Sequence, residues 1–556
     1  MRLARVLVAV GVGMALADAS VVTLALPELI VELDTTVEGV AAVLGVYTLV
    51  LAVAMMPAEW LRRRIGTAPL GAIGFALFAL AGAACGAVDS LAPLLVLRGA
   101  QAVGGAAGLV CGFALLSASE GGRERLWTGA AVLGAAAGPA LGGLLTELFD
   151  WRAIFLVQAP IGVLAAAPFV LPGAARDALR AHDSDAPRAA ALDEIEIGPA
   201  AALALVSAAL VAVLFLLVLL LVSGWSIPPL EAALAVSILP LAALAGIRIP
   251  GPAGTRAAAG CALVGAGVVG LAFPGGASVA WTVVPQVLAG VGMGLSLTAL
   301  IGPLLPERTP AQTALLLAIR HGGITLALVI LAPVAAAQVD SAVEDTRERG
   351  AALVLDAELP PLDKLDLAGG VTGELDPVDP RGTLQDSLQG AANLGDDPEG
   401  EAVYTELTRR ADETLVAGVD RAFAPAFLIA AVMALLGAVV LAPRLDQRAR
   451  AVSAGIAACA LALSAAQSAV AVASRPDPVT IADPCEPRDL PSTGGIGGIA
   501  QDAGLAGLDR AACEFGSSRE ELAIALVDDE AADEYESEHG VDPRSIGTLL
   551  GGALGL

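Results

Sequence analysis

The stretch that decides the fold is residues 134–162, GAAAGPALGGLLTELFDWRAIFLVQAPIG. Its spaced glycines are Gly134, Gly138, Gly142 and Gly143. Most of them lie four residues apart, so they share one face of a helix and let a neighbouring backbone approach closely. Pro139 removes a backbone donor, so we expect a segment that packs tightly yet bends, as in a membrane bundle with moving parts. Generic packing accounts for these glycines but leaves Trp151, Arg152 and Pro160–Gly162 unexplained.

The composition is that of an integral membrane protein. Of the 556 residues, 56% are hydrophobic, and the mean hydropathy is +0.76. Many apolar runs reach the roughly 20 residues that a helix needs to cross a bilayer. The first run, near residues 6–30, is too long for the apolar part of a secretory signal and contains Asp18. We therefore interpret it as an uncleaved first helix.

The apolar runs form two sets of six, with a polar linker between them and one run after them. They lie near residues 6–30, 38–56, 68–88, 91–117, 124–147, 151–172, 199–222, 228–247, 257–274, 279–304, 311–339, 421–443 and 450–473. This order predicts an all-α membrane protein with two bundles facing each other across a central path. The expected parts are a bundle at 1–172, a cytoplasmic linker at 173–198, a bundle at 199–443 with an acidic loop at 340–420, an extra transmembrane helix at 444–473 and a C-terminal module at 474–556.

The net charge of −26 comes from two polar segments. Residues 340–420 carry 20 acidic and 6 basic side chains, and residues 474–556 carry 17 and 5. A solvated acidic surface is the simpler explanation, and attraction of cations is the alternative. Nothing in the chain indicates nucleic-acid binding, which would need a basic patch.

Arginines concentrate on one side of the predicted spans. They are Arg2, Arg5, Arg62–Arg64, Arg123, Arg125, Arg248, Arg256, Arg308 and those within 176–188 and 444–450. The loops on the opposite side are acidic, with Arg152 as the main exception. The positive-inside rule then predicts a multi-pass plasma-membrane protein with a cytoplasmic N-terminus. The 340–420 loop and the C-terminal module would be external.

The C-terminal module has its own folding signals. Cys485 and Cys513 are the only cysteines of the polar tail, and on an external face we expect them to form a disulfide closing a 29-residue loop. Two free thiols are the alternative. Residues 518–521, SREE, fit a capping box before an apolar helix face. The module is therefore expected to be helical, and an external protein partner is one use for it.

The pattern GxxxGPxxGG at 134–143, with the WRxIF and PIG that follow, resembles the antiporter motif of major facilitator drug exporters. It is most similar to their drug/proton branch, whose members commonly have 14 spans. DASVVTLALPEL at 18–29 resembles the first-helix signature of the family, and LLVLRGAQAVGG at 94–105 resembles its RxxQGxG motif. The resemblance implies a major facilitator fold of two six-helix bundles. It also implies proton coupling through Asp18 and Arg98, with Gln101 in the same motif.

The residues themselves support a role for Asp18 and Arg98. Both are ionisable groups inside predicted spans, where a charge is expensive and usually functional. A carboxyl group in a low-dielectric cavity favours its protonated form, which suits proton uptake and release. Arg98 keeps its charge and must face a partner, water or carbonyl groups. Purely structural hydrogen bonding is the alternative for each of them.

Two further segments match the family less closely. AIRHGGITLA at 318–327 resembles its RxxGGxxGxA segment, which gives Arg320 either a gating role or contact with lipid headgroups. PAEWLRRRIGTAPL at 57–70 stands where relatives carry a GxLaDRxGRR-type motif. Arg64 and Gly66 keep their places, but Arg63 replaces an aspartate that helps latch the cytoplasmic side in relatives. We expect another latch, such as Glu59 with Arg62–Arg64.

These features predict secondary active export of a drug-like, lipophilic or lipidic compound by alternating access, as in multidrug efflux. The proton gradient would supply the energy, and no cofactor or metal is expected. A non-transporting membrane receptor or scaffold for envelope machinery is the alternative, and the altered loop and two acidic segments favour it. The chain carries no P-loop, HExxH or GxSxG motif, so we do not expect an enzyme. The low aromatic content of 3% favours aliphatic over flat aromatic substrates.

Overall fold

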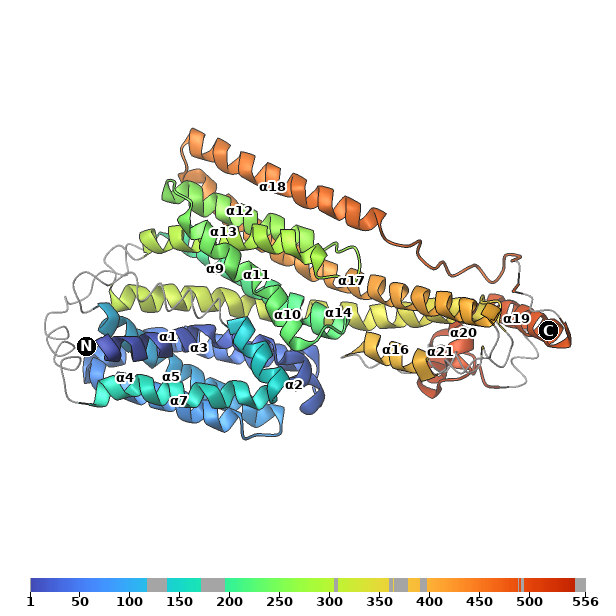
Figure 1. The fold of residues 1–556 in the computed structure, drawn as a ribbon, viewed down its shortest axis with the longest axis horizontal. Coiled ribbons are helices and arrows are strands. Elements are labelled where there is room, and N and C mark those ends of the chain that lie inside the picture. The colour runs from blue at the N-terminus through green and yellow to red at the C-terminus, as the bar shows by residue number, and fades with distance from the viewer. Residues whose placement is uncertain are drawn as a thin grey trace. The chain divides into compact units, whose positions relative to one another are not determined.

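The computed structural model describes residues 2–117, 138–171, 196–304, 309–359, 364, 379–390, 398–488, 490–491 and 495–545. The chain divides into two compact units. The first comprises Met1–Val222, Ile227–Ala337 and Phe423–Ala473, and the second comprises Ser223–Ser226, Gln338–Ala422 and Ser474–Leu556. Helices form the regular structure of both units, and the described ranges contain no β-strand (Figure 1).

The first half of the first unit is a helical bundle. Its helices are α1 (Arg2–Thr23), α2 (Leu26–Glu32), α3 (Val37–Ile65), α4 (Thr67–Cys85), α5 (Leu91–Ser117), an unlabelled helix at 138–148 and α7 (Trp151–Val170). Local sequence sets the ends of α3. The Thr36 hydroxyl accepts a hydrogen bond from the Gly39 N–H at its start, and Gly66 ends it with a φ of 92°, which glycine adopts without strain.

The second half of the first unit is a bundle of the same kind. Its helices are α9 (Ile197–Leu219), α10 (Pro229–Val236), α11 (Ile238–Arg248), α12 (Ala253–Leu271), α13 (Ala280–Leu304), the first part of α14 (Pro310–Leu355), the last part of α17 (Pro398–Leu441) and α18 (Gln447–Ala473). A short π-helical segment, Leu220–Gly224, ends α9. The added helix α18 packs mainly along α12.

Twelve helices of the described ranges are long and apolar enough to cross a membrane. They correspond to twelve of the thirteen predicted runs. The remaining run, near 124–147, lies partly outside the described residues, and its second part is helical at 138–148. The predicted linker at 173–198 lies almost wholly outside them. The all-helical membrane fold expected from the sequence is confirmed.

The second unit joins the acidic loop and the C-terminal module, which the sequence alone predicts as separate parts. Its helices are the end of α14, α16 (Pro380–Gly390), the start of α17, α19 (Gly495–Phe515), α20 (Arg519–Ala525) and α21 (Asp529–His539). Apolar side chains of α19, α20 and α21 form a small core around Leu522 and Tyr535. Cys485 and Cys513 form a disulfide, and Ser518 with Glu521 forms the capping box that starts α20.

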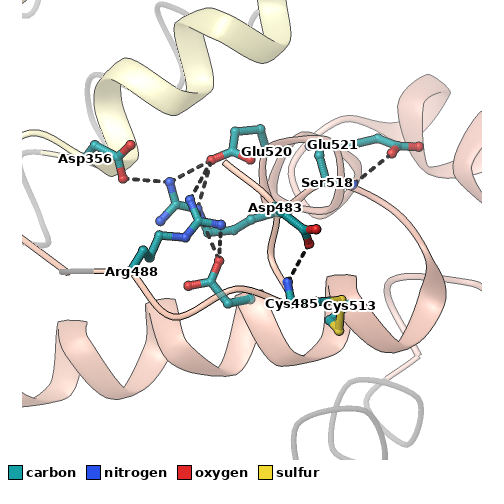
Figure 2. Close-up of polar contacts among 10 residues, drawn as sticks. Asp356, Asp483, Cys485, Arg488, Cys513, Ser518, Glu520 and Glu521 are labelled. Carbon is teal, nitrogen blue, oxygen red and sulfur yellow. Dashed lines mark hydrogen bonds and ion pairs between the residues drawn. A yellow bond between two sulfur atoms is a disulfide. The ribbon is translucent and has the colours of Figure 1, made fainter. Parts of the chain in front are cut away.

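A buried group of charges lies in this second unit (Figure 2). The Arg519 side chain is fully buried and donates to Glu520 Oε1 from Nη2 at 2.6 Å and from Nε at 3.0 Å. Its Nη2 also donates to Oδ1 of Asp356, the residue that follows α14, at 2.7 Å. Arg488 pairs with Asp509 of α19 and lies 3.7 Å from Glu520. The group therefore links α20 to α14 and to the segment that contains Cys485.

Candidate functional site

The two charged residues that the sequence places in separate spans meet in the core of the first bundle. The Nη2 atom of Arg98 in α5 lies 2.6 Å from Oδ2 of Asp18 in α1, and Nη1 lies 3.0 Å from Oδ1. Both side chains are 0% exposed. Two parallel N–H···O bonds of this kind are the strongest arrangement for a guanidinium and a carboxylate. Both oxygens of Asp18 are thus occupied by Arg98.

Polar groups from two further helices complete the surroundings of Arg98. Its Nη1 also donates to Gln101 Oε1 at 2.7 Å, and its Nε donates to the Val43 carbonyl oxygen of α3 at 3.3 Å. The ring of Tyr47 lies below the guanidinium, 4.3 Å from it, which adds a cation–π contact. Gln101 in turn donates to Gln158 of α7 at 2.8 Å. Four helices therefore share one polar centre.

Helix spacing explains part of this centre. Arg98 and Gln101 lie three residues apart and so share one face of α5. Gln101 is the polar residue that its motif predicts, and the structure gives it a direct contact with Arg98. Tyr47 and Gln158 were not singled out from the sequence. A polar amide inside an apolar run is itself a signal, because an unpaired amide in the membrane is costly. That signal could have identified Gln158.

The described glycines of the 134–143 motif lie against two different neighbouring helices, α1 and α10. A Cβ atom on Gly138 would lie against Ser20 of α1, and one on Gly142 would lie 3.2 Å from Leu24 Cβ, so these two glycines let the helix at 138–148 approach α1. A Cβ atom on Gly143 would meet Ala233 of α10 and lie 2.8 Å from the Pro229 carbonyl oxygen. Gly143 therefore faces the other bundle. Gly134 lies outside the described residues.

The arginine that departs from the positive-inside pattern is neutralised locally. Arg152 donates to Glu32 Oε2 at 2.6 Å and to Asp89 Oδ1 at 2.7 Å. The Trp151 indole N–H donates to the same Glu32 oxygen at 2.9 Å. These hydrogen bonds lower the pKa of Glu32, which keeps the carboxylate charged. The Trp–Arg pair of the motif thus fixes the start of α7 to α2.

A cavity lies between the two bundles. Its empty volume is about 850 Å³, and its wall is mostly leucine, valine and other apolar side chains of α1, α9, α10, α11, α13 and α14, together with Pro139. The polar residues of the wall are Ser20, Ser207, Gln286, Arg320 and His321. Apolar cavities with a few convergent polar groups are the usual form of small-molecule sites. Arg320, for which the sequence left two roles open, therefore lies at the cavity.

Hydrogen bonds between the bundles occur at two places in the described residues. The hydroxyl groups of Thr48 in α3 and Thr325 in α14 lie 3.0 Å apart, and both residues are buried. Near the start of α10, the Leu230 N–H donates to Glu147 Oε2 at 2.9 Å.

His321 is buried, and its Nδ1 lies 2.8 Å from the Leu317 carbonyl oxygen. A histidine satisfied by its own helix agrees with the ordinary structural role.

The altered loop motif forms ion pairs within one helix. Glu59 is buried and pairs with Arg62 at 2.7 Å and with Arg63 at 2.8 Å, all on α3. Arg62 also donates to Thr67 Oγ1 at the start of α4, at 3.0 Å. Arg64 instead packs over the Trp60 ring at 3.9 Å. Glu59 thus engages two of the three expected arginines, and these contacts join α3 to α4.

Comparison with known proteins agrees with this architecture. The family model described as Major Facilitator Superfamily matches residues 8–330, more than half of the chain. The chain belongs to the Major Facilitator Superfamily. The bacterial homolog of the human lysosomal transporter Spinster, solved in an inward-facing and unoccupied conformation, superposes with a TM-score of 0.52 at 14% identity, over 80% of this chain and 98% of that chain. At that identity the likeness concerns the fold alone.

Several curated relatives are drug exporters. Multidrug resistance protein Stp of Mycobacterium tuberculosis is 39% identical over 166 residues, 28% of this chain and 31% of that protein. The tetracenomycin C resistance and export protein of Streptomyces glaucescens is 33% identical over 163 residues, 28% of this chain and 30% of that protein. The riboflavin transporter RibZ of Clostridioides difficile is 30% identical over 165 residues, 29% of this chain and 36% of that protein. The chain thus matches about a third of the length of these relatives, which are transporters and not enzymes.

Proposed function

We propose that this protein is a secondary active exporter that couples proton entry to the export of a lipophilic or lipidic compound by alternating access. The observation that carries the proposal is the sealed ion pair of Asp18 and Arg98, built into a major facilitator bundle beside a cavity between the bundles. A buried ion pair is weak evidence of stability, because desolvation of the two charges offsets their attraction. Its presence in a membrane bundle therefore favours a working role.

The geometry suggests how the proton would act. A proton on Asp18 removes the negative charge that Arg98 faces, and the paired charge-assisted N–H···O bonds are weakened to those of a neutral carboxyl group. Arg98 would keep Gln101 and the Val43 carbonyl oxygen as acceptors. The proton and the guanidinium thus compete for the same carboxylate. Asp18 belongs to α1 and Arg98 to α5. Weakening the bond between them would therefore change how α1 packs against α5 in the centre of the first bundle.

The orientation and the cavity complete the proposal. With the N-terminus in the cytoplasm, the arginine-rich loops face inward and the second unit lies outside. Export would require the bundles to separate and close again at the contacts Thr48–Thr325 and Glu147–Leu230. The drug resistance and export for which the relatives are named support efflux as the direction of transport. The apolar wall supports a lipophilic or lipidic substrate.

The test is substrate-dependent proton movement in energised inside-out vesicles, with wild type, Asp18→Asn and Glu231→Gln compared. Glu231 is exposed at the start of α10 and serves as the matched control. We expect substrate-triggered proton release in wild type and in the control, and its loss in Asp18→Asn. Correctly inserted wild-type protein that moves no proton with any lipophilic compound would favour the non-transporting alternative.

A further inference from the structure

Among its described residues, the wall of the central cavity carries a positive charge and no carboxylate, which does not suit a cationic ligand. We propose that the substrate is an anionic amphiphile, with an aliphatic body and one acidic headgroup that Arg320 binds. The inference rests on the proposed transport function and narrows its substrate class. A carboxylate, a phosphate monoester and a sulfate share the required chemistry.

Arg320 supplies the positive charge of this cavity. It lines the wall from α14, and among the described wall residues there is no aspartate or glutamate. In the described part of the chain no carboxylate lies within ion-pair distance of Arg320. A guanidinium cannot give up its proton in a protein. An anionic ligand would therefore supply a counter-charge that the described residues of the wall do not provide.

The carboxylate nearest in sequence to the cavity wall is not available to a cationic ligand. Asp18 precedes the wall residues Ala19 and Ser20, but its side chain is 0% exposed and both of its oxygens are bonded to Arg98. A lipophilic cation in the cavity would thus meet Arg320 without an opposing charge from the wall. The apolar wall offers little to screen that repulsion.

Two buried polar groups of the wall also lack partners. Among the described residues, the hydroxyl of Ser207, which is 2% exposed, has no hydrogen-bond partner, and neither has Oε1 of the fully buried Gln286. An unpaired polar group of this kind costs free energy unless a ligand or water satisfies it. Ser207 can donate to the headgroup, and Gln286 Oε1 can accept from a hydroxyl group of the ligand. The remaining wall is apolar and fits an alkyl chain.

The experiment uses ligands of one chain length, because the aliphatic contribution is then constant. Full-length protein in zwitterionic nanodiscs is saturated with the fluorescent acid 11-(dansylamino)undecanoate, which is displaced by dodecanoate, dodecyl phosphate, dodecanol or dodecyltrimethylammonium. We expect the two anions to bind at least tenfold more tightly than dodecanol, and the cation to bind most weakly. Equal affinities for the four ligands would overturn the proposal.

Substitutions then test whether Arg320 is the cause. Arg320→Gln should reduce anion affinity about tenfold or more while leaving dodecanol affinity unchanged, and Arg320→Lys should retain part of the preference. Arg248→Gln, which removes an exposed cation of α11, is the matched control and should behave as wild type. An anion preference that survives in Arg320→Gln would show that lipid or another cation produces it, and would overturn the assignment.

Failure of this inference and failure of the proposed function give different results. Ligand binding is measured at equilibrium without a proton gradient. If the protein shows no preference for anions but still releases protons in an Asp18-dependent way, the proposed substrate class is wrong and the proposed export function stands. If it binds anions but no ligand triggers proton release, proton-coupled export is wrong and the proposed binding site stands.

Discussion

Arg98 of the first bundle and Arg519 of the second unit are both fully buried, yet their surroundings differ. Arg98 faces one carboxylate, Asp18, through two parallel hydrogen bonds. Arg519 faces Glu520 and Asp356, lies 3.9 Å from Asp509, and shares this group with a second arginine, Arg488 (Figure 2). Arg98 has a single carboxylate partner, whereas Arg519 belongs to a network of several charges.

The difference shows how a buried charge can serve function or assembly. Protonation of one group, Asp18, would break the pair around Arg98, so that pair can respond to a single proton. Loss of one carboxylate around Arg519 leaves others in place. The Arg519 network also leaves Nη1 of Arg519 and Oε2 of Glu520 unpaired, whereas Arg98 and Asp18 have no such orphan atom. We infer that the first arrangement suits switching and the second suits holding helices together.

The largest effect is expected from Arg98→Met. It leaves the Asp18 carboxylate buried without its cation, and breaking a buried pair in this way costs about 3–5 kcal/mol. Thermal unfolding of the full chain in detergent should show the loss, and proton-coupled transport should be absent. The double variant Asp18→Asn/Arg98→Met should recover most of the stability but no transport. A single variant as stable as wild type would mean that the two charges are not coupled.

A smaller effect is expected from Arg519→Met. Arg488 remains near Glu520, so the carboxylate keeps part of its compensation, and we expect a cost of about 2 kcal/mol. Hydrogen exchange of α19–α21 in the full chain should become about 30-fold faster, since local opening reports this free energy. Transport in vesicles should persist. If Arg519→Met abolished transport while the hydrogen exchange of α19–α21 stayed unchanged, the structural role of Arg519 would be contradicted.

The smallest effect is expected from Ser518→Ala, which tests whether Arg519 acts through its charge or through the start of α20. The Ser518 hydroxyl accepts a hydrogen bond from the Glu521 N–H at 2.9 Å and leaves the ions untouched. Removal of such a cap costs about 1 kcal/mol. Exchange should accelerate in α20 by about fivefold, less than in Arg519→Met. If hydrogen exchange accelerated equally in both variants, Arg519→Met would act by weakening the start of α20 and not by removing the charge.

The same comparison explains what the sequence could reveal. Asp18 and Arg98 are conspicuous because charges are rare in apolar runs, whereas Arg519 and Glu520 are ordinary residues in an acidic tail. Periodicity and span length predict the helices, since each span must satisfy its own backbone. The contact between Asp18 and Arg98, which are 80 residues apart, depends on how helices pack, and sequence spacing does not give it.

The cavity shows the same limit. Ser207 is inconspicuous in the sequence, and Gln286 carries only the general signal of an amide in an apolar run, because one or two polar groups in a span are tolerated when they have partners. Their importance arises from the lack of a partner among the described residues of the folded chain. Arg320 was conspicuous, but only the fold shows that it faces the cavity. Charge in a span can be predicted from one sequence, while the direction it faces cannot.

Gly143 sets how closely the two bundles can approach each other at the start of α10. Its missing side chain lets the helix at 138–148 come within backbone distance of Pro229 and Ala233. A methyl group there would act as a wedge, because neither the backbone of α10 nor the Ala233 side chain can move aside without separating the bundles. How closely the two bundles meet at this point is therefore set by the absence of a single carbon atom.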